Sequence, residues 1–341
     1  MNEKMKALIY EGPRELHIRE VEVPILKENE VLVQVAFTGI CGSEISGYLG
    51  ENSLRKPPLI MGHELSGVVA KIGSSVTKWE EGARVVVNPL VSCGLCDACL
   101  SGKAQLCIDR RLLGAHLPGS YAQYVKVPET ALHLIPDSLS LEEAALVEPL
   151  ACAARVAELS RVNPTDKVFI AGTGPIGLFV LQVMTLYGVT DLYVSDINPE
   201  RLEMARTFGA TTIHAKDENV VERVRELTGG TGVNVAVDAI GMQITRNQCI
   251  EAVSFGGKVI FTGLHQNETS LPINDMIRKE ISTHGSFAYS PKNFAQALSW
   301  IIQNRISLQD WVLKEPLEKG KDSFERLLKQ PGSIAKILLI P

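Results

Sequence analysis

The sequence predicts an α/β protein with two domains: a mainly-β domain and a doubly wound parallel sheet. Three observations support this fold class. The length of 341 residues suits about two domains. Short alternating apolar runs, separated by glycine and proline, fill the chain to about residue 139. From about residue 164, apolar strands alternate with helical segments, which is the pattern of a parallel sheet covered by helices.

Composition is ordinary for a globular protein and excludes some partners. Hydrophobic residues make up 45% of the chain and charged residues 21%, with a net charge of −5. A mildly acidic chain is a poor ligand for nucleic acid or for an anionic membrane surface. The sequence has no apolar run long enough to span a bilayer and no signal peptide at its start. We therefore expect a cytoplasmic protein with neither nucleic acid nor membrane as a partner.

The first part of the chain predicts a compact, mainly antiparallel β domain. Its expected strands are Ala7–Tyr10, Arg19–Val23, Val31–Phe37, Gly67–Ile72, Ala83–Val87 and Tyr121–Val127. The last part predicts two helices, at Pro291–Asn304 and Asp322–Lys329, and a final apolar strand at Ala335–Ile340. A single strand needs a sheet to join, and the first domain offers one. The expected domains are 1–152 for the mainly-β domain, 153–287 for the parallel-sheet domain and 288–341 for the return to the mainly-β domain.

Four cysteines form the densest motif of the chain. Cys93, Cys96, Cys99 and Cys107 follow the spacing C-x2-C-x2-C-x7-C, so four thiols can surround one ion within a single lobe at about residues 92–108. Zinc suits an all-thiolate tetrahedron and needs no open position in a structural role. The alternative is a set of buried or disulfide-bonded cysteines, and the absence of a signal peptide disfavours it. We predict a structural zinc site.

A second metal site is predicted from residues that lie farther apart. Cys41 follows a strand, and His63 and Glu64 stand side by side at the start of another strand. Alone, each has an ordinary explanation, as a small buried side chain or a surface pair. Together they supply the thiolate, imidazole and carboxylate of an open catalytic zinc site. Whether they meet in space is not given by the sequence.

Glu148 is a further candidate ligand. A helix is predicted over 140–159, with Ser140 and Glu143 as a capping box. Pro149 interrupts this helix, and Glu148 comes just before the interruption among alanine, leucine and valine. A buried carboxylate needs a partner, because an unpaired buried charge is costly. That partner is either a metal ion or an arginine or lysine elsewhere in the chain.

The middle part carries a dinucleotide fingerprint. The strand 167–171 runs into Gly172-Thr173-Gly174-Pro175-Ile176-Gly177, a helix follows, and Asp196 ends the next strand. This is the context in which glycines allow a tight turn and a close approach of the pyrophosphate to the helix N-terminus. Asp196 would accept hydrogen bonds from the ribose hydroxyls and repel a 2′-phosphate, which favours NAD over NADP. The positive charge of Arg201 lies close by in the sequence and acts against this preference. The alternative is an ordinary strand-to-helix turn.

In combination, these motifs resemble the zinc-dependent medium-chain alcohol and polyol dehydrogenases over essentially the whole chain. The resemblance implies a GroES-like mainly-β catalytic domain and a Rossmann domain. Glu148-Pro149-Leu150 is similar to the sorbitol dehydrogenase branch. The matching motifs are Gly39-Ile40-Cys41-Gly42-Ser43, Gly62-His63-Glu64, the four-cysteine lobe, Glu148-Pro149-Leu150 and the glycine fingerprint with Asp196. Three further stretches are similar to galactitol-phosphate dehydrogenases: Gly263-Leu264-His265-Gln266, Arg278-Lys279-Glu280-Ile281 and Gly285-Ser286-Phe287.

The resemblance also implies roles for single residues. Cys41, His63 and a carboxylate, either Glu64 or Glu148, would hold the catalytic zinc, and Ser43 would pass on the substrate proton. The backbone near Gly263-Leu264 and Ser286-Phe287 would orient the nicotinamide. The implied reaction is hydride transfer between NAD and a secondary alcohol, with a polyol as the substrate. The family also implies a homo-oligomer, either a dimer or a tetramer.

Two departures from the family pattern leave the substrate open. Ser46 stands where polyol dehydrogenases often place a relay histidine, and His116-Leu117-Pro118-Gly119-Ser120 stands where relatives more often carry two glycines. Sugar-alcohol phosphates, vicinal diols and L-threonine are alternative substrates. A catalytically inactive NAD-binding sensor is a remote alternative. A nucleic-acid-binding zinc ribbon is disfavoured, because the lobe has few basic or aromatic residues.

Overall fold

A computed structural model describes residues 3–308 and 311–341. The first two residues of the predicted catalytic domain and residues 309–310 of its return segment lie outside the described part. Contacts divide the chain into two compact units, each considered by itself below. Unit 1 is Met1–Glu148, Ser290–Asn304 and Leu308–Pro341, and unit 2 is Pro149–Tyr289 and Arg305–Ser307. Among the helices at 3–308 and 311–341, none has the length and apolar character to cross a bilayer.

Unit 1 is built on antiparallel strands, as predicted. A seven-stranded sheet has the order β10-β6-β5-β3-β18-β17, with β9 also paired to β3, and a three-stranded sheet has the order β2-β1-β4. A short pair, β7 and β8, stands apart. The strands are β1 Lys4–Gly12, β2 Glu15–Glu22, β3 Glu30–Gly39, β4 Leu59–Ile60, β5 Glu64–Ile72, β6 Arg84–Val87, β7 Leu90–Val91, β8 Arg111–Leu112, β9 Tyr124–Pro128, β10 Leu132–Leu134, β17 Val312–Pro316 and β18 Lys336–Ile340.

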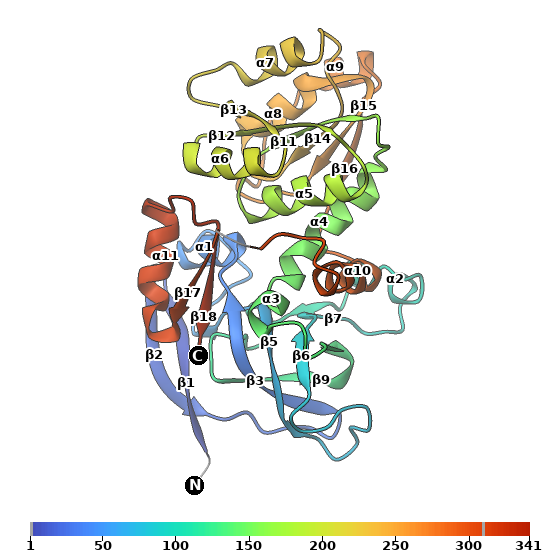
Figure 1. The fold of residues 1–341 in the computed structure, drawn as a ribbon. Helices are drawn as coiled ribbons and strands as arrows, with labels where there is room; N and C mark the ends of the chain where they lie inside the picture. The colour runs from blue at the N-terminus through green and yellow to red at the C-terminus, as the bar shows by residue number, and fades with distance from the viewer. Residues whose placement is uncertain (1–2, 309–310) are drawn as a thin grey trace. The chain divides into compact units, whose positions relative to one another are not determined.

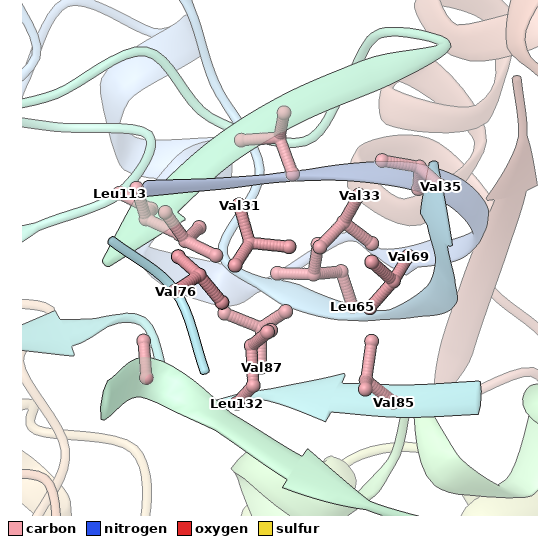
Figure 2. Close-up of a cluster of buried hydrophobic side chains, with 13 residues drawn as sticks. Val31, Val33, Val35, Leu65, Val69, Val76, Val85, Val87, Leu113 and Leu132 are labelled. Carbon is pink, nitrogen blue, oxygen red and sulfur yellow. The ribbon is translucent and has the colours of Figure 1, made fainter. Parts of the chain in front are cut away.

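Alternation along the strands directs apolar side chains into the core of unit 1. Val31, Val33 and Val35 of β3 point to one face, because successive side chains of a strand point to opposite faces. They pack with Leu65 and Val69 of β5 in a cluster shown in Figure 2. These two strands also carry the candidate ligands at their ends. The buried core therefore fixes the register that places the ligands.

The final strand joins the first sheet, which confirms that prediction. β18 pairs antiparallel with β3, with Leu338 opposite Gly39, and parallel with β17. Ile337 and Leu339 face a second apolar cluster, which includes Tyr121. Lys336 and Leu338 therefore face the other side of the strand. A lysine that begins an otherwise apolar buried strand must have a charged partner.

The predicted helix at 140–159 is two helices, α3 Leu141–Ala144 and α4 Val147–Ser160. Ser140 and Glu143 form the expected capping box of α3. The position of the break was predicted wrongly. Pro149 lies in the first turn of α4, where its missing N–H costs no helical hydrogen bond, and the chain breaks before Val147. The other helices of unit 1 are α1 Gly42–Tyr48, α2 Asp97–Leu100, α10 Pro291–Ile302, α11 Gly320–Lys329 and the 3-10 turns Ala104–Leu106, Glu129–Ala131 and Leu317–Lys319.

Unit 2 is a doubly wound sheet, as predicted. Its six strands are all parallel in the order β13-β12-β11-β14-β15-β16, so the order reverses beside β11. Within this unit, α5 and α6 lie on one face of the sheet, and α7 and α8 on the other (Figure 1). The elements are β11 Lys167–Ala171, α5 Pro175–Leu186, β12 Asp191–Asp196, α6 Pro199–Thr207, β13 Thr211–His214, α7 Val220–Leu227, β14 Val233–Asp238, α8 Gln243–Ala252, β15 Val253–Phe261, α9 Ile273–Arg278 and β16 Ser282–Gly285.

Candidate metal and nucleotide sites

The four cysteines of the lobe come together as the spacing predicts. The sulfur of Cys93 lies 3.9 Å from that of Cys99 and 3.5 Å from that of Cys107. The sulfurs of Cys96 and Cys99 are 3.5 Å apart. A tetrahedron with zinc–sulfur bonds of about 2.3 Å has edges of roughly 3.8 Å, whereas a disulfide bond is about 2.05 Å long. All four cysteines are free thiols, and their spacing fits a zinc ion.

The backbone of the lobe prepares these sulfurs for a cation. The N–H groups of Leu95 and Cys96 donate to Cys93 Sγ at 3.5 and 3.4 Å. These two bonds, together with the Cys107 thiol, lower the pKa of Cys93 to about 6. A thiol with this pKa is a thiolate at neutral pH, which is the form that binds metal.

The second predicted cluster also forms. The ligand atoms of Cys41, His63 and Glu64 lie within 4.8 Å of one another. Cys41 is the N-cap of α1, and Glu64 is the first residue of β5, opposite Gly39 in the register. Gly39 must lack a side chain, because a Cβ there would lie 2.0 Å from a carboxylate oxygen of Glu64. The donor set of thiol, imidazole and carboxylate fits zinc with a position left open.

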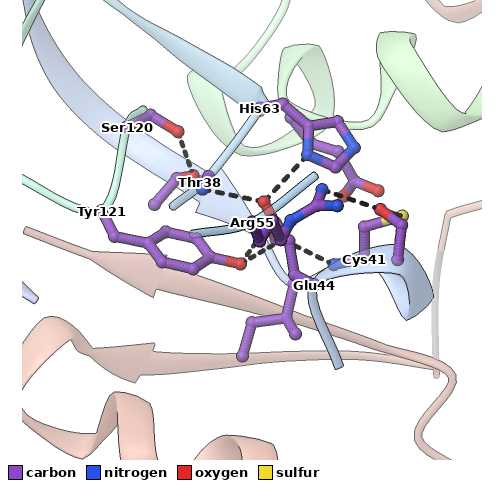
Figure 3. Close-up of polar contacts among 12 residues, drawn as sticks. Thr38, Cys41, Glu44, Arg55, His63, Ser120 and Tyr121 are labelled. Atoms are coloured by element: carbon purple, nitrogen blue, oxygen red, sulfur yellow. Dashed lines mark hydrogen bonds and ion pairs between the residues drawn. The ribbon is translucent and has the colours of Figure 1, made fainter. Parts of the chain in front are cut away.

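A buried carboxylate orients the histidine of this cluster. Glu44 Oε1 accepts hydrogen bonds from Gly62 N and His63 Nδ1, both at 2.8 Å, and Oε2 accepts from Cys41 N at 3.1 Å and from the Tyr121 hydroxyl. Figure 3 shows these contacts converging on Glu44. Burial opposes ionisation, but the charge and hydrogen bond of His63 outweigh it and hold the pKa of Glu44 at about 2. With Nδ1 engaged, Nε2 is the nitrogen that remains for a metal.

A buried lysine neutralises the carboxylate of the cluster. Lys336 Nζ lies 2.7 Å from both carboxylate oxygens of Glu64 and donates to the Ile40 carbonyl at 2.9 Å. Both side chains are almost fully buried. Burial alone would lower the pKa of Lys336, but the Glu64 carboxylate and the Cys41 thiol raise it. Lys336 therefore stays charged and holds Glu64 beside Cys41.

Glu148 is the alternative carboxylate for this site. It is buried in the first turn of α4 and is not one of the three residues whose ligand atoms converge within 4.8 Å. Its charge is close enough to help raise the pKa of Lys336. Glu148 therefore lies near the cluster, but Glu64 is the better candidate for the carboxylate ligand in this arrangement.

Ser43 lies directly beside the cluster. Its hydroxyl donates to Cys41 Sγ at 3.4 Å, and the hydroxyl of Ser46, one turn along α1, donates to the Gly42 carbonyl at 3.3 Å. In the 116–120 segment, the Ser120 hydroxyl pairs with Thr38 Oγ1 at 2.6 Å and is buried. Ser46 is thus engaged with its own helix, and Ser120 supports β3.

The glycine turn of unit 2 has the geometry that a pyrophosphate requires. Gly174 is the N-cap of α5, Pro175 is the first residue of the helix, and nothing lies within 4 Å of a Cβ placed on Gly174. A Cβ on Gly177 would lie 1.9 Å from the Gly172 carbonyl, so only glycine permits this packing. Ile176 is in the same first turn. The open helix N-terminus is the feature that binds phosphate.

Asp196 connects the glycine turn to the turn that follows β12 through hydrogen bonds. Its Oδ2 accepts from Thr173 N at 2.7 Å and Thr173 Oγ1 at 2.8 Å, and its Oδ1 accepts from Ile197 N at 2.7 Å and Asn198 N at 2.9 Å. Arg201 lies in the first turn of α6, where burial lowers its pKa and the Asp196 charge opposes that shift. The carboxylate is held at the end of β12, beside the glycine turn.

The other predicted nucleotide residues lie at the same edge of the sheet. Gly263 and Leu264 follow β15, Ser286 and Phe287 follow β16, and Leu264 and Phe287 are exposed. The Gly263 N–H donates to the Asp238 carbonyl at 3.0 Å. Ligands of open parallel sheets bind at the carboxyl ends of the strands, beside the point where the order reverses.

Comparison with known proteins agrees with this arrangement. Residues 27–137 match the alcohol dehydrogenase GroES-like domain, and residues 175–303 match the zinc-binding dehydrogenase domain. Sorbitol dehydrogenase of Bacillus subtilis is 34% identical over 99% of this chain and 98% of its own length. The chain belongs to the zinc-binding alcohol dehydrogenase family. The predicted family and fold class are thereby confirmed.

Solved structures of this family have the same fold. An alcohol dehydrogenase from Escherichia coli CFT073 in complex with NADH superposes with a TM-score of 0.92 at 29% identity, covering 99% of each chain. Galactitol-1-phosphate dehydrogenase from Escherichia coli superposes with a TM-score of 0.91 at 25% identity, covering 99% of this chain and 100% of its own. The chain is similar to both along its whole length.

The sequence analysis of this zinc-binding dehydrogenase missed three polar residues around the buried cluster. They are Glu44, Lys336 and Arg55. Glu44 has a weak signal, because it is the N3 residue of a capping box that begins at Cys41. Lys336 has a clearer one, as the only charged residue of the apolar run 335–340. The sequence around Arg55 gives no signal.

Proposed function

We propose that the chain is an NAD-dependent dehydrogenase that oxidises a secondary alcohol of an open-chain polyol to a ketone and reduces the ketone in reverse. One observation carries this proposal: a thiol, an imidazole and a carboxylate converge in a buried cluster beside the Ser43 hydroxyl. The four lobe cysteines would supply an all-sulfur structural site. The second, mixed cluster is therefore free for chemistry.

Two sets of residues would hold zinc. Cys41, His63 and either Glu64 or Glu148 would hold the catalytic ion, and the four lobe cysteines would hold the structural one. When bound, the catalytic ion supplies a Lewis acid for the substrate oxygen. The role of Glu44 is to keep the proton on His63 Nδ1, and the role of Lys336 is to hold the Glu64 carboxylate in place.

Ser43 would accept the proton of the substrate hydroxyl. Its oxygen lies beside Cys41 and retains acceptor capacity, because a hydroxyl has one donor and two lone pairs. Ser46 takes the place of the relay histidine found in many polyol dehydrogenases, and its hydroxyl is engaged with Gly42. The proton would therefore leave Ser43 through a cofactor ribose hydroxyl or water.

The glycine turn and Asp196 would hold NAD. The pyrophosphate would lie on the N–H groups at the start of α5, and Asp196 would accept the adenosine ribose hydroxyls while repelling a 2′-phosphate. The nucleotide contacts proposed here are Gly172, Gly174, Pro175, Ile176, Gly177, Asp196, Arg201, Gly263, Leu264, Ser286 and Phe287. Asp196→Ala should reduce the preference for NAD over NADP in kcat/KM. Unchanged discrimination would remove Asp196 from the ribose site.

The proposed assembly is a homodimer or homotetramer in the cytoplasm. β16 is an edge strand that pairs only with β15 in the described sheet, and all four of its residues are exposed. An unprotected edge with free backbone groups is a template for pairing with a second copy. Reduced thiols in both clusters suit a reducing compartment. Sedimentation equilibrium would determine the number of copies.

The test is NADH formation by zinc-replete protein on matched substrate panels. The panels are free hexitols and pentitols, their phosphates, vicinal diols and L-threonine, each with NAD and NADP. We expect the highest kcat/KM for a free polyol with NAD. Turnover confined to phosphates would retain the reaction and change the substrate class. Bound NADH with no turnover on any panel, with both zinc sites filled, would contradict the proposed function.

A further inference from the structure

Arg55 lies against the buried cluster with no assigned role. It belongs to the loop 49–58 between α1 and β4, and its side chain is almost fully buried. Its Nη2 donates to the Ser43 hydroxyl oxygen at 3.0 Å. Asn52 of the same loop donates from Nδ2 to the Ser43 carbonyl at 3.4 Å, and Arg55 N donates to the Asn52 carbonyl. One loop thus holds both the backbone and the side chain of Ser43.

The helix that carries Ser43 leaves room for this arginine. Ser43 and Gly47 are four residues apart on α1, so they lie on the same face, one turn apart. A Cβ on Gly47 would lie 2.4 Å from Arg55 Cδ and 3.2 Å from Arg55 Cβ. The methylenes of Arg55 therefore occupy the space of a side chain at position 47. The guanidinium Nη2 thereby reaches the Ser43 hydroxyl, and Figure 3 shows Arg55 near Cys41 and Glu44.

The contact decides which hydrogen bonds remain for Ser43. A guanidinium only donates and keeps its charge at any pH the protein experiences, so Arg55 cannot take a proton from Ser43. It occupies one acceptor lone pair of Ser43 Oγ, while the hydroxyl proton points to Cys41 Sγ. One lone pair is left on Ser43 Oγ. The orientation of that lone pair is set by Arg55.

The arginine also brings charge to the cluster. Its positive charge helps lower the pKa of Glu44, and its Nε is buried with no hydrogen-bond partner among the described residues. A buried cation that makes one side-chain hydrogen bond is expensive to keep unless it serves another group. The group it touches is the hydroxyl next to the candidate catalytic cysteine.

We propose that Arg55 is a positioning residue that fixes Ser43 Oγ as the acceptor for the substrate hydroxyl, whose proton Ser43 takes up as it releases its own proton to a cofactor ribose hydroxyl or water. This inference rests on the proposed function, because only an alcohol dehydrogenase gives Ser43 a proton to accept. Gly47 contributes to this positioning, because its lack of a side chain leaves space for Arg55. Gly47 and Ser46 lie on α1 with Ser43, and Ser46 stands where polyol dehydrogenases often place a relay histidine.

A double-mutant cycle between Arg55 and Ser43 tests the proposal. Arg55→Met keeps the methylene packing and removes the donors, and we expect kcat to fall about 10- to 100-fold with KM changed less than about threefold. Arg55→Lys should recover part of the loss. In a Ser43→Ala background, Arg55→Met should have almost no further effect on kcat, because non-additivity marks residues that act through one another. If Arg55→Met and Ser43→Ala lowered kcat by factors that simply multiply in the double variant, the proposal would be overturned.

Gly47→Ala and Arg19→Met complete the activity measurements. The added methyl of Gly47→Ala displaces Arg55 without removing it, so it should reproduce part of the kcat loss and add nothing to Arg55→Met. Arg19 pairs with Glu11 on the half-exposed surface of β2, and Arg19→Met should leave kcat unchanged. A rise in KM with constant kcat for Arg55→Met would instead make Arg55 a substrate contact and contradict a positioning role.

A spectroscopic readout separates this inference from the proposed function. With cobalt in the cluster, the thiolate-to-metal charge-transfer band reports on Cys41, to which Ser43 donates. Arg55→Met should shift this band, and the shift should vanish in the Ser43→Ala background. If the wild-type protein oxidised no alcohol, the proposed function would fail while this cycle still tested the contact. An equal shift in both backgrounds, or none in either, would overturn the inference.

Discussion

The lobe and the buried cluster of unit 1 bring sulfur ligands together in different ways. The four lobe cysteines come from fifteen consecutive residues and are supported by backbone N–H groups from the same segment. Cys41, His63 and Glu64 come from the ends of different elements, and the polar groups around them include residues from three further segments. A local loop is sufficient to hold an ion. A site that must also leave one position open needs its ligands held by the whole sheet.

The lobe and the buried cluster also differ in how far their ligands are exposed to solvent. Cys93 is exposed, whereas His63 and Glu64 are buried. In the buried cluster Glu44 is paired with His63 and Glu64 with Lys336, because unpaired charges are costly away from water. The lobe has no such network and relies on the ion itself. We therefore expect changes in the two regions to affect different properties, namely stability in the lobe and turnover in the cluster.

The largest expected effect is a contrast between two cysteine substitutions. Cys41→Ser should abolish turnover, with NADH binding by fluorescence retained and one zinc lost, because Cys41 is a proposed ligand of the catalytic zinc. Cys99→Ser should also cost one zinc, but should act mainly by lowering thermal stability. If Cys99→Ser removed turnover from fully folded protein, the division between the two regions would be wrong.

Lys336→Met should be the most destabilising change among the supports of the cluster. It leaves Glu64 buried without its counter-ion, and breaking a buried pair in this way costs about 3–5 kcal/mol. Urea unfolding of the zinc-free protein measures the free energy, because a zinc ion held by Glu64 would itself act as a counter-ion. Lys314→Met is the matched control, because Lys314 pairs with Glu142 at the surface and should cost less than about 1 kcal/mol. Equal costs for both variants would contradict a buried, charged Lys336.

Glu44→Gln should reduce activity or zinc affinity at the cluster by about 10- to 100-fold. The amide is a weaker acceptor for His63 Nδ1–H, and partners of metal-binding histidines have effects of this size. Glu143→Gln is the control, because Glu143 is also the N3 residue of a capping box but faces solvent. Activity and zinc content measured on both variants separate orientation of His63 from helix capping.

The smallest effect is expected at the link between α1 and α11. Glu325 accepts from Tyr48 and Arg14 and pairs with Lys329, and the Lys329 and Tyr48 hydrogen bonds lower its pKa to about 2 from an ordinary value of 4.5. Because the pKa of Glu325 is lower in the folded protein than in the unfolded chain, the ionised carboxylate stabilises the fold above pH 4.5. This stabilisation is lost as the pH falls from 4.5 toward 2. Glu325→Gln should cost about 1 kcal/mol at pH 7 after allowance for solvent screening.

Urea unfolding at several pH values checks this last prediction. The difference between wild type and Glu325→Gln should shrink through the window from pH 4.5 to pH 2. A difference that stayed constant through this window would show that the carboxylate charge is not what holds the two helices together.

The parts that the sequence predicted are those that depend on local patterns. The parallel sheet of unit 2, the glycine turn and the lobe follow from strand periodicity and close spacing. The break before Val147 was placed wrongly, because a proline in the first turn of a helix is compatible with a start as well as with an interruption. Local propensity does not distinguish the two.

The supports of the buried cluster were not predicted, because they depend on register between distant segments. Lys336 reaches Glu64 because β18 pairs with β3. In this pairing Ile337 points to the face of the strand opposite Lys336. Arg55 reaches Ser43 only since Gly47 has no side chain. Such complementarity is invisible in a single sequence: the lone lysine of the run 335–340 signals a charged partner without identifying it, and an arginine in a loop is ordinary.

The pairing of Lys336 with Glu64 has a consequence for biosynthesis. The two residues are 272 positions apart, so at about 5–20 residues per second the ribosome makes Lys336 roughly 15–55 s after Glu64. The lobe, by contrast, is finished once Cys107 has been synthesised. The nascent chain can therefore acquire its structural ion long before its reaction centre is complete. Maturation of the two sites is ordered in time by the path of the polypeptide.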